Sequence, residues 1–221
     1  ENMVPAGGFY EFTTGVNWKS VRDVDNEGYH VAMAHPALQD LYGATYFDEP
    51  FENGISRSTG AYSTHGGRRW SVRNYLKHAP LQMSLPEDLR RRWTYYGLFP
   101  NCVIAMTPEV VQFYQEFPLS VSKTLQRGAI YKRPVETREE KLARYLAKRI
   151  DRDTGREDVQ LTIWSNESMK SKAFDDFHLS DLELGVKSHH DHVRNALPVV
   201  RLQEEPRDRP IAEVNRQLTE A

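Results

Sequence analysis

The sequence predicts an α+β fold in which helices flank a central antiparallel sheet. Two observations predict it: β-forming and aromatic residues concentrate in the middle of the chain, and helical patterns precede and follow them. A chain of 221 residues has the length of one large domain or of two small ones. We expect one domain over residues 1–203 and, because Pro206 and Pro210 interrupt the tail, a surface arm over residues 204–221.

Strands are expected mainly in the middle of the chain, where β-formers and aromatic residues alternate between short turns. Gly66-Gly67 is typical of a hairpin turn between two of them. The expected strands are 9–14, 57–64, 68–76, 98–106, 110–117 and 119–131.

Helices are expected on both sides of these strands. A helix over 17–35 ends at His35, because the residue before Pro36 is disfavoured in helical conformation. Apolar residues at helical spacing predict a helix over 136–152, which Asp153-Thr154-Gly155 ends in a turn. Two further helices are expected at 158–170 and 175–193.

Charge and cysteine content exclude several classes of function. Lys and Arg number 29 against 31 Asp and Glu, which removes the electrostatic reason to expect nucleic acid or an anionic membrane as the main partner. No apolar run approaches the roughly 20 residues of a membrane helix. The single cysteine, Cys102, excludes an internal disulfide and fits a reducing, cytoplasmic compartment. It also excludes a cysteine-ligated iron–sulfur cluster within these residues.

The stretch from Asn17 to Pro36 carries the most distinctive chemistry. His30 and His35 stand five residues apart, and Glu27 precedes His30 by three. On a regular helix, positions i and i+5 diverge by about 140°, so the two rings would not address one atom. Pro36 forces His35 out of the helix and lets its ring turn back towards His30. The spacing alone also fits two ordinary polar residues at a helix end.

The residues around this histidine pair resemble a known metal-binding motif. Asn17-Trp18-Lys19, then Glu27, Tyr29-His30 and His35-Pro36 together resemble the iron-binding helix of Rieske non-heme iron oxygenases, the ring-hydroxylating α subunits. The stretch 96–101 resembles the central strand of that family. The resemblance implies a helix-grip (START/Bet v1-like) domain, in which an antiparallel sheet embraces a long helix over a deep apolar cavity.

The resemblance implies that His30, His35 and a distant carboxylate hold a mononuclear Fe(II). Family members place this carboxylate just before a helix, and Asp175, Asp176 and Asp181 are the candidates. With Asp175 at the head of the helix, the apolar positions 179, 182 and 186 share one face, whereas Asp176 falls on a polar face. We therefore expect Asp175 as the third ligand, with Asp176 as the alternative.

Other residues take roles by the same resemblance. In the family, an acid at the position of Glu27 hydrogen-bonds the first histidine and bridges to the Rieske centre of a neighbouring subunit. The substrate cavity has four aromatic candidates, for each of which core packing is an equally good interpretation: Tyr95, Tyr96, Phe99 and Phe113. The run 189–192, His-His-Asp-His, is interpreted as a solvated helix face.

The resemblance implies the catalytic domain of an enzyme, of ring-hydroxylating dioxygenase type, that activates O2 at Fe(II) to hydroxylate a small hydrophobic or aromatic substrate. Its electrons come from a Rieske [2Fe–2S] cluster. The chain has one cysteine, so the cluster is expected outside these residues, and the resemblance implies that the cluster domain precedes Glu1. Family members form homotrimers, and an NAD(P)H-dependent reductase supplies electrons, directly or through a ferredoxin.

Three alternatives stay open at this point. The first is a monooxygenase or demethylase of the same family, because pattern does not reveal the cavity shape that selects the reaction. The second is a metal-free helix-grip domain that carries hydrophobic ligands. The third is a zinc hydrolase using His30, His35 and Glu27, which is disfavoured because an acid three residues before the first histidine faces away from the open coordination site.

Overall fold

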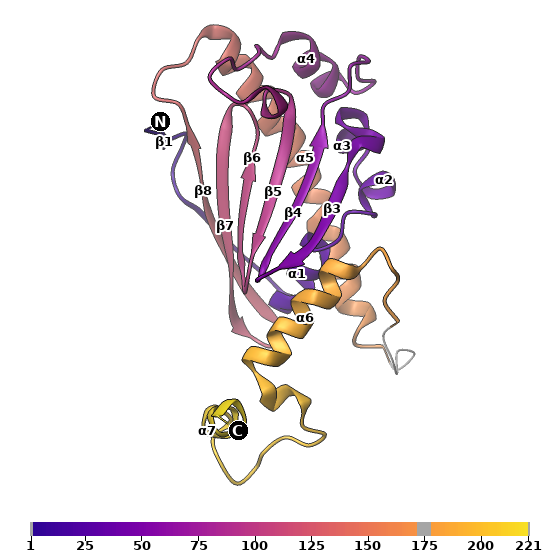
Figure 1. Cartoon of the computed structure of the whole chain (residues 1–221), viewed down its shortest axis with the longest axis vertical. Coiled ribbons are helices and arrows are strands. Elements are labelled where there is room, and N and C mark those ends of the chain that lie inside the picture. The colour runs from indigo at the N-terminus through magenta and orange to yellow at the C-terminus, as the bar shows by residue number, and fades with distance from the viewer. Residues whose placement is uncertain (1, 172–177, 221) are drawn as a thin grey trace.

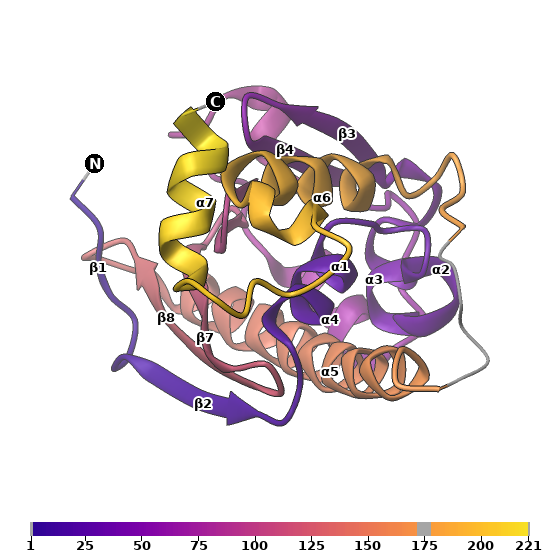
Figure 2. The same cartoon turned by 90° about the horizontal axis from the view of Figure 1, so that it is seen from below.

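A curved antiparallel sheet wraps around one long helix in the computed structural model, which describes residues 2–171 and 178–220 (Figure 1). The strand order is β1-β8-β7-β6-β5-β4-β3, and β2 also pairs with β8. Seen from below, the sheet curls from β3 round to β2, with α5 and α1 inside the curve and α6 across the opposite side (Figure 2). This α+β arrangement is a helix-grip fold, which confirms the predicted fold class.

The strands of the sheet and the helices around it have the following bounds. The strands are β1 (Val4–Pro5), β2 (Tyr10–Thr14), β3 (Phe47–Glu52), β4 (Ile55–Ala61), β5 (Arg92–Leu98), β6 (Cys102–Met106), β7 (Val110–Ser120) and β8 (Lys123–Lys132). The α-helices are α1 (Trp18–Asp25), α2 (Val31–Ala34), α3 (Pro36–Leu41), α4 (Trp70–His78), α5 (Arg138–Ser168), α6 (Leu184–Ala196) and α7 (Ile211–Glu220). Short 3-10 turns are η1 (Gly43–Thr45), η2 (Glu87–Leu89) and η3 (Pro198–Arg201).

The long helix α5 begins at a capping box. The Thr137 side chain accepts a hydrogen bond from the backbone N–H of Glu140, whose carboxylate accepts from the Thr137 N–H. Its first half enters the core through Leu146 and Ile150, which pack with residues of α3 and α4. The predicted turn at 153–155 is wrong, because helical hydrogen bonding continues through it. A glycine inside a helix costs only about 1 kcal/mol relative to alanine, less than the packing on both sides gains.

Three other segments differ from the expected elements. The helix expected over 17–35 is split into α1 and α2, and Gly28 lies in the gap, where an added Cβ would overlap the ring of Tyr46. The strand expected at 68–76 is helix α4, whose buried Val72 and Tyr75 are three residues apart. The helix expected from residue 175 begins at 184 within the described residues. The strands expected at 9–14, 110–117 and 119–131 are confirmed.

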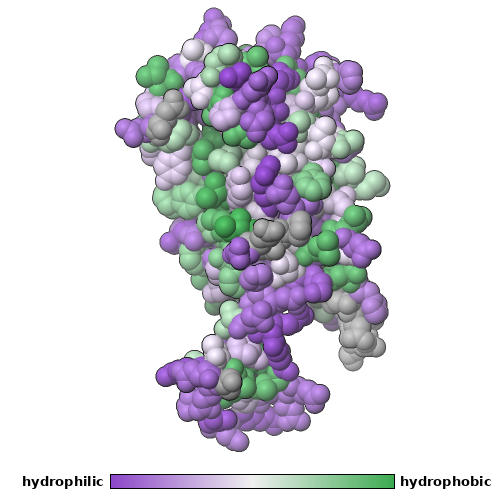
Figure 3. All heavy atoms as spheres, viewed as in Figure 1, coloured by the Kyte–Doolittle hydropathy of each residue, from purple (hydrophilic) through white to green (hydrophobic). Residues whose placement is uncertain are grey.

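The tail after residue 203 contains helix α7, which packs against η3 at the lower end of the molecule (Figure 1). On the face shown in Figure 3, hydrophilic side chains cover this tail and the loops at the top, and apolar side chains gather over the strands between them. In the part of the chain that the structure describes, no helix combines the length and apolarity needed to cross a membrane.

The core contact of α5 is expected to support the whole fold. Leu146 is fully buried, and replacing it with alanine leaves a cavity that costs about 2–5 kcal/mol of unfolding free energy. For a domain of this size we expect the thermal midpoint to fall by roughly 5–15 °C. Leu142, one turn earlier and 42% exposed, is the matched control, and L142A should change the midpoint by only a few degrees. Equal losses in a thermal melt would contradict this placement of α5.

Candidate metal centre

His30 and His35 lie at the two ends of the single-turn helix α2. His30 precedes α2, and His35 is the junction between α2 and α3, whose first residue is Pro36. The backbone of His35 is not helical (φ −115°, ψ 77°), which is the departure that Pro36 predicts. The two Nε2 atoms consequently lie 3.0 Å apart, with the ring planes inclined at 74°.

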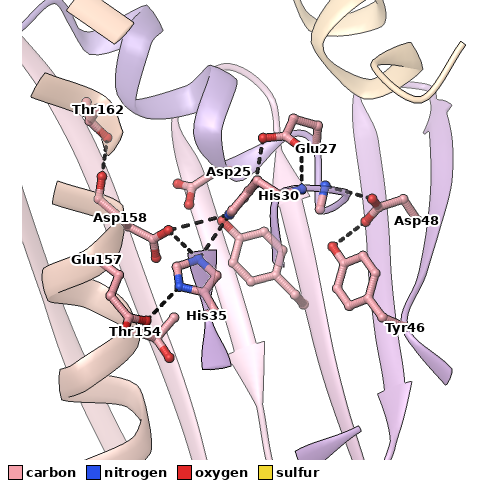
Figure 4. A network of polar contacts seen from close by, with 12 residues as sticks. Asp25, Glu27, His30, His35, Tyr46, Asp48, Thr154, Glu157, Asp158 and Thr162 are labelled. Atoms are coloured by element: carbon pink, nitrogen blue, oxygen red, sulfur yellow. Dashed lines mark hydrogen bonds and ion pairs between the residues drawn. The ribbon is translucent and has the colours of Figure 1, made fainter. Parts of the chain in front are cut away.

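The third acidic partner of this pair comes from the long helix α5. The Oδ1 atom of Asp158 lies 2.8 Å from Nε2 of His35 and 3.6 Å from Nε2 of His30 (Figure 4). The two nitrogens and a carboxylate oxygen all lie within 4.8 Å of one another. Asp158 was not predicted, because a turn at 153–155 would end the helix before residue 158. Asp158 would then not share the core-facing side of that helix. Asp175 and Asp176, the expected candidates, lie outside the described residues.

A signal for Asp158 was present in the sequence. It follows Leu146, Ile150 and Thr154 at intervals of four residues, so an acid stands in register with the buried face of α5. A carboxylate on a core-facing stripe requires a cationic or metal partner, because burial of an unpaired charge is costly.

Each imidazole ring is also held by a glutamate at its Nδ1 atom, on the side away from Asp158. Nδ1–H of His30 donates to Oε1 of Glu27 (2.5 Å), and Nδ1–H of His35 donates to Oε2 of Glu157 (2.9 Å) (Figure 4). Since Nδ1 carries the proton in each ring, the Nε2 lone pairs point towards Asp158. The contact between Glu27 and His30 is the one that the resemblance implies, whereas Glu157 was not predicted.

The backbone that carries Glu27 and His30 is tied to the sheet. The N–H of Gly28 donates to Oδ2 of Asp48 on β3 (2.9 Å), and the Tyr46 hydroxyl donates to Oδ1 of the same carboxylate (2.5 Å). The gap between α1 and α2 is therefore held in place from β3, and the first imidazole is held with it.

The donor set fits a divalent transition metal. Two ligand atoms at right angles, each about 2.1 Å from a metal, are about 3.0 Å apart. The spacings within this triad are 3.0, 2.8 and 3.6 Å. Two bare imidazole lone pairs that face each other need a proton or a cation between them. Two histidines and one carboxylate on one side of the ion are the facial triad of non-heme Fe(II) sites.

Without the ion, the cluster binds protons instead. Burial lowers the pKa of His30, but hydrogen bonds to Asp158 and Glu27 outweigh it and raise that pKa to about 10. The pKa of His35 is raised in the same way by Asp158 and Glu157, against burial. Burial raises the pKa of Asp158, but the two imidazoles outweigh this and bring it below its ordinary value. The site attracts positive charge, whether protons or a metal ion.

The model of the ring-hydroxylating α subunit, catalytic domain, matches residues 7–198. The chain belongs to this family. Its family membership confirms the resemblance carried by the stretch from Asn17 to Pro36.

Solved structures of Rieske oxygenases share the fold. The chain is similar to a quaternary ammonium Rieske monooxygenase linked to carnitine oxidation by gut microbiota (17% identity, TM-score 0.62, 87% of this chain and 49% of that chain). It is also similar to naphthalene 1,2-dioxygenase from Rhodococcus sp. (12%, TM-score 0.57, 86% and 56%) and to NdmA of Pseudomonas putida CBB5 with caffeine (13%, TM-score 0.52, 92% and 59%). The chain thus spans about half the length of these relatives. Among curated proteins, no sequence matches it significantly.

A cavity adjoins the histidine pair. It has a volume of about 580 Å³, within the usual range for a small-molecule site. His30, His35 and Asp158 line it together with aromatic side chains from the sheet and the helices. These aromatic residues are Tyr10, Phe12, Tyr42, Tyr46, Tyr62, Tyr75, Trp93, Tyr95 and Tyr114.

Of the four aromatic residues expected at the cavity, Tyr95 lines it. Tyr96 follows Tyr95 on β5 and so points to the other face of the sheet. The ring of Phe99 lies against His189 and His192, and the ring of Phe113 lies against Phe9 and Tyr131. None of these three is among the described residues that line the cavity. Trp93 shares the face of Tyr95, a relation that strand alternation makes predictable.

Asp25 places a partnered carboxylate in the cavity wall. It accepts hydrogen bonds from the Tyr114 hydroxyl (3.2 and 3.3 Å) and forms an ion pair with the fully buried Arg22 (3.4 Å). Burial raises the pKa of Asp25 to about 6, and Arg22 opposes the shift. Arg22 also lies 3.9 Å from Glu116, a second fully buried acid. Asp25 therefore already has its counter-charge.

A second group of possible ligands lies between α1 and α6. Nε2 of His190 lies 2.7 Å from Oδ1 of Asp23, and His189 is close enough to complete a cluster with them. His189 is fully buried and its Nε2–H donates to the carbonyl of Pro100 (3.0 Å). The interpretation of 189–192 as a solvated face is therefore wrong for His189.

Proposed function

We propose that this chain, a Rieske oxygenase catalytic domain, uses mononuclear Fe(II) and O2 to hydroxylate a small aromatic or hydrophobic substrate. The convergence of His30, His35 and Asp158 beside a cavity of about 580 Å³ carries the proposal. Three ligands on one side of the ion leave positions free for O2, and the cavity holds a substrate next to those positions.

Bound iron would supply a site at which O2 is bound and reduced. The residues of the chain prepare that site. His30 and His35 would ligate through Nε2, because Glu27 and Glu157 hold their Nδ1 protons. Asp158 would supply the negative charge. The aromatic side chains of the cavity would exclude water and position the substrate ring.

The electrons are proposed to come from outside these residues. Glu27 is held on the outer side of His30, so it is placed to relay an electron or proton from a Rieske [2Fe–2S] cluster. We propose that residues 1–203 form the catalytic domain, that residues 204–221 form an arm, and that the cluster domain precedes Glu1 in a cytoplasmic homotrimer. An NAD(P)H-dependent reductase, directly or through a ferredoxin, would reduce the cluster.

A monooxygenase or demethylase is the second candidate for the reaction. The quaternary ammonium monooxygenase and the caffeine-bound NdmA support it, because both share the fold of this chain. A metal-free ligand carrier and a zinc hydrolase are the competing classes. A metal-free carrier does not account for two glutamates that leave both Nε2 atoms bare beside a third acid. The zinc hydrolase requires Glu27 as a ligand, but Glu27 lies on the Nδ1 side of His30, away from Asp158.

Anaerobic titration with Fe(II) at several pH values tests the proposal. In the metal-free protein His30 is protonated at neutral pH, because its pKa is raised to about 10. Iron must displace that proton, so we expect one iron per chain and an affinity that increases by about tenfold per pH unit as the pH rises towards 10. A pH-independent affinity, or the absence of iron binding, would contradict the proposed site.

The stability of the metal-free protein should follow the opposite trend. Because the folded pKa of His30 lies above the ordinary value of about 6.5, its contribution is fully present below that pH. The contribution is lost as the pH rises towards 10. Thermal melts with and without Fe(II) should therefore diverge as the pH increases.

A further inference from the structure

One acid in the cavity takes no part in the metal site. Asp151 lines the cavity on α5, seven residues before Asp158. Seven residues complete nearly two helical turns, so the two side chains point in nearly the same direction about 10 Å apart along the helix. Asp151 therefore faces the same space as the proposed iron ligands, at a distance set by the helix.

The carboxylate of Asp151 has no partner among the described residues, none of which hydrogen-bonds to it or forms an ion pair with it. Its side chain is accessible, yet the surrounding protein desolvates it and raises its pKa to about 6, with the charge of Asp158 adding to the shift and Lys148 opposing it. At neutral pH the group is mostly ionised. A desolvated carboxylate without a partner is costly, and a bound cation would offset that cost.

The described basic residues near Asp151 do not form an ion pair with it. Arg152 lines the cavity but pairs with Asp153 (2.8 Å), and Lys148 is exposed on the preceding turn. Arg156 also lines the cavity, but it is exposed and lies five residues after Asp151, about 140° further round the helix. Asp151 thus differs from the cavity acid Asp25, which has Arg22.

Aromatic rings stand near this carboxylate. Tyr10 and Phe12 project from β2 into the cavity, and their rings stack with centroids 6.5 Å apart. Burial raises the pKa of Tyr10 to about 12, and the charge of Asp151 adds to that shift. A carboxylate close to aromatic rings is a suitable environment for an organic ammonium group, which is attracted by the charge and by the ring faces.

We propose that the cavity selects substrates that carry a cationic nitrogen and that Asp151 binds this nitrogen. The inference rests on the proposed function and specifies its substrate class. Because Asp151 and Asp158 lie about 10 Å apart along α5, the nitrogen and the oxidised carbon would lie at opposite ends of the substrate. The class is therefore that of arylalkylamines oxidised away from the nitrogen, rather than amines oxidised on a carbon bonded to it.

Calorimetric binding of three phenylalkyl probes of similar length tests this inference: 2-phenylethylammonium, the neutral 2-phenylethanol and the anionic 3-phenylpropionate. We expect the wild-type chain to bind the ammonium at least about tenfold more tightly than either of the others. Asp151→Asn should reduce this preference to about twofold and leave the affinity for 2-phenylethanol unchanged. Glu167→Gln is the matched control, because it removes one negative charge from an exposed position of the same helix, and it should keep the preference.

Equal binding of the ammonium and the alcohol by the wild-type chain would overturn the inference, and so would an unchanged preference in Asp151→Asn. Asp151→Glu keeps the charge and should keep the preference, which covers the case in which Asp151→Asn fails to fold. Iron content is measured on the same samples. Ammonium selectivity without iron binding would refute the proposed function alone, and iron binding without selectivity would refute this inference alone.

Discussion

Asp158→Asn should lower the affinity of the chain for Fe(II) by roughly 100-fold or more, because the amide removes both a ligand oxygen and the negative charge of the site. Anaerobic titration measures the loss. The fold should persist, since Asp158 lies towards the end of α5 and its partners are the two imidazoles rather than the core. The far-ultraviolet spectrum of the variant should therefore match that of the wild-type protein.

The same titration separates Asp158 from the two acids that the sequence suggested. Asp175→Asn and Asp176→Asn remove the same charge from nearby positions in the chain. We expect both variants to bind iron as the wild-type protein does. If either loses iron while Asp158→Asn retains it, the third ligand belongs to that residue instead.

Glu27→Gln should retain iron but lower turnover per bound iron by roughly 100-fold in the chain joined to its Rieske domain. The carboxylate of Glu27 holds the Nδ1 proton of His30 and lies on the side of the ring away from Asp158. The amide keeps the size of the side chain but loses the charge that supports a relay. Iron content and product formation are measured on the same preparation.

Glu157→Gln is the matched control for Glu27→Gln. It changes the equivalent hydrogen bond on the other imidazole, where Oε2 of Glu157 accepts from Nδ1–H of His35. We expect it to retain iron as Glu27→Gln does, without lowering turnover per bound iron, because Glu157 lies on α5 and outside the proposed relay. Equal turnover losses in the two variants would show that both glutamates only hold the ligands.

The histidine pair was predictable because its geometry depends on residues that are close to it in the sequence. A proline directly after His35 breaks the helix, and this break converts a spacing of five residues into two facing nitrogens. Part of the sheet was predictable too, since β7 and β8 are rich in β-branched and aromatic residues. Local patterns of this kind require no knowledge of the distant chain.

Asp158, the proposed third ligand, was missed because a local signal competed with tertiary packing. Asp153-Thr154-Gly155 is typical of a turn, but α5 is held against the core on both sides of it and stays helical. In the same way, α4 has β-forming residues but packs as a helix on α5. Whether Gly155 ends a helix depends on contacts that sequence spacing does not contain.

The cavity residues were predicted only in part for a related reason. Tyr95 and Tyr96 are both tyrosines on β5, but successive residues of a strand point to opposite faces of the sheet. Only Tyr95 therefore points into the cavity. The register that decides between them is set by pairing with β4 and β6. Asp151 lies within the expected helix 136–152, but helical spacing does not reveal the cavity that the residue lines.

A crystal structure of the chain loaded anaerobically with Fe(II), with anomalous data at the iron edge, tests the central claim most directly. We predict one strong peak about 2.1 Å from Nε2 of His30, Nε2 of His35 and a carboxylate oxygen of Asp158. A peak elsewhere, such as beside Asp23 and His190, or these three side chains turned apart with no metal between them, would contradict the assignment of an iron centre.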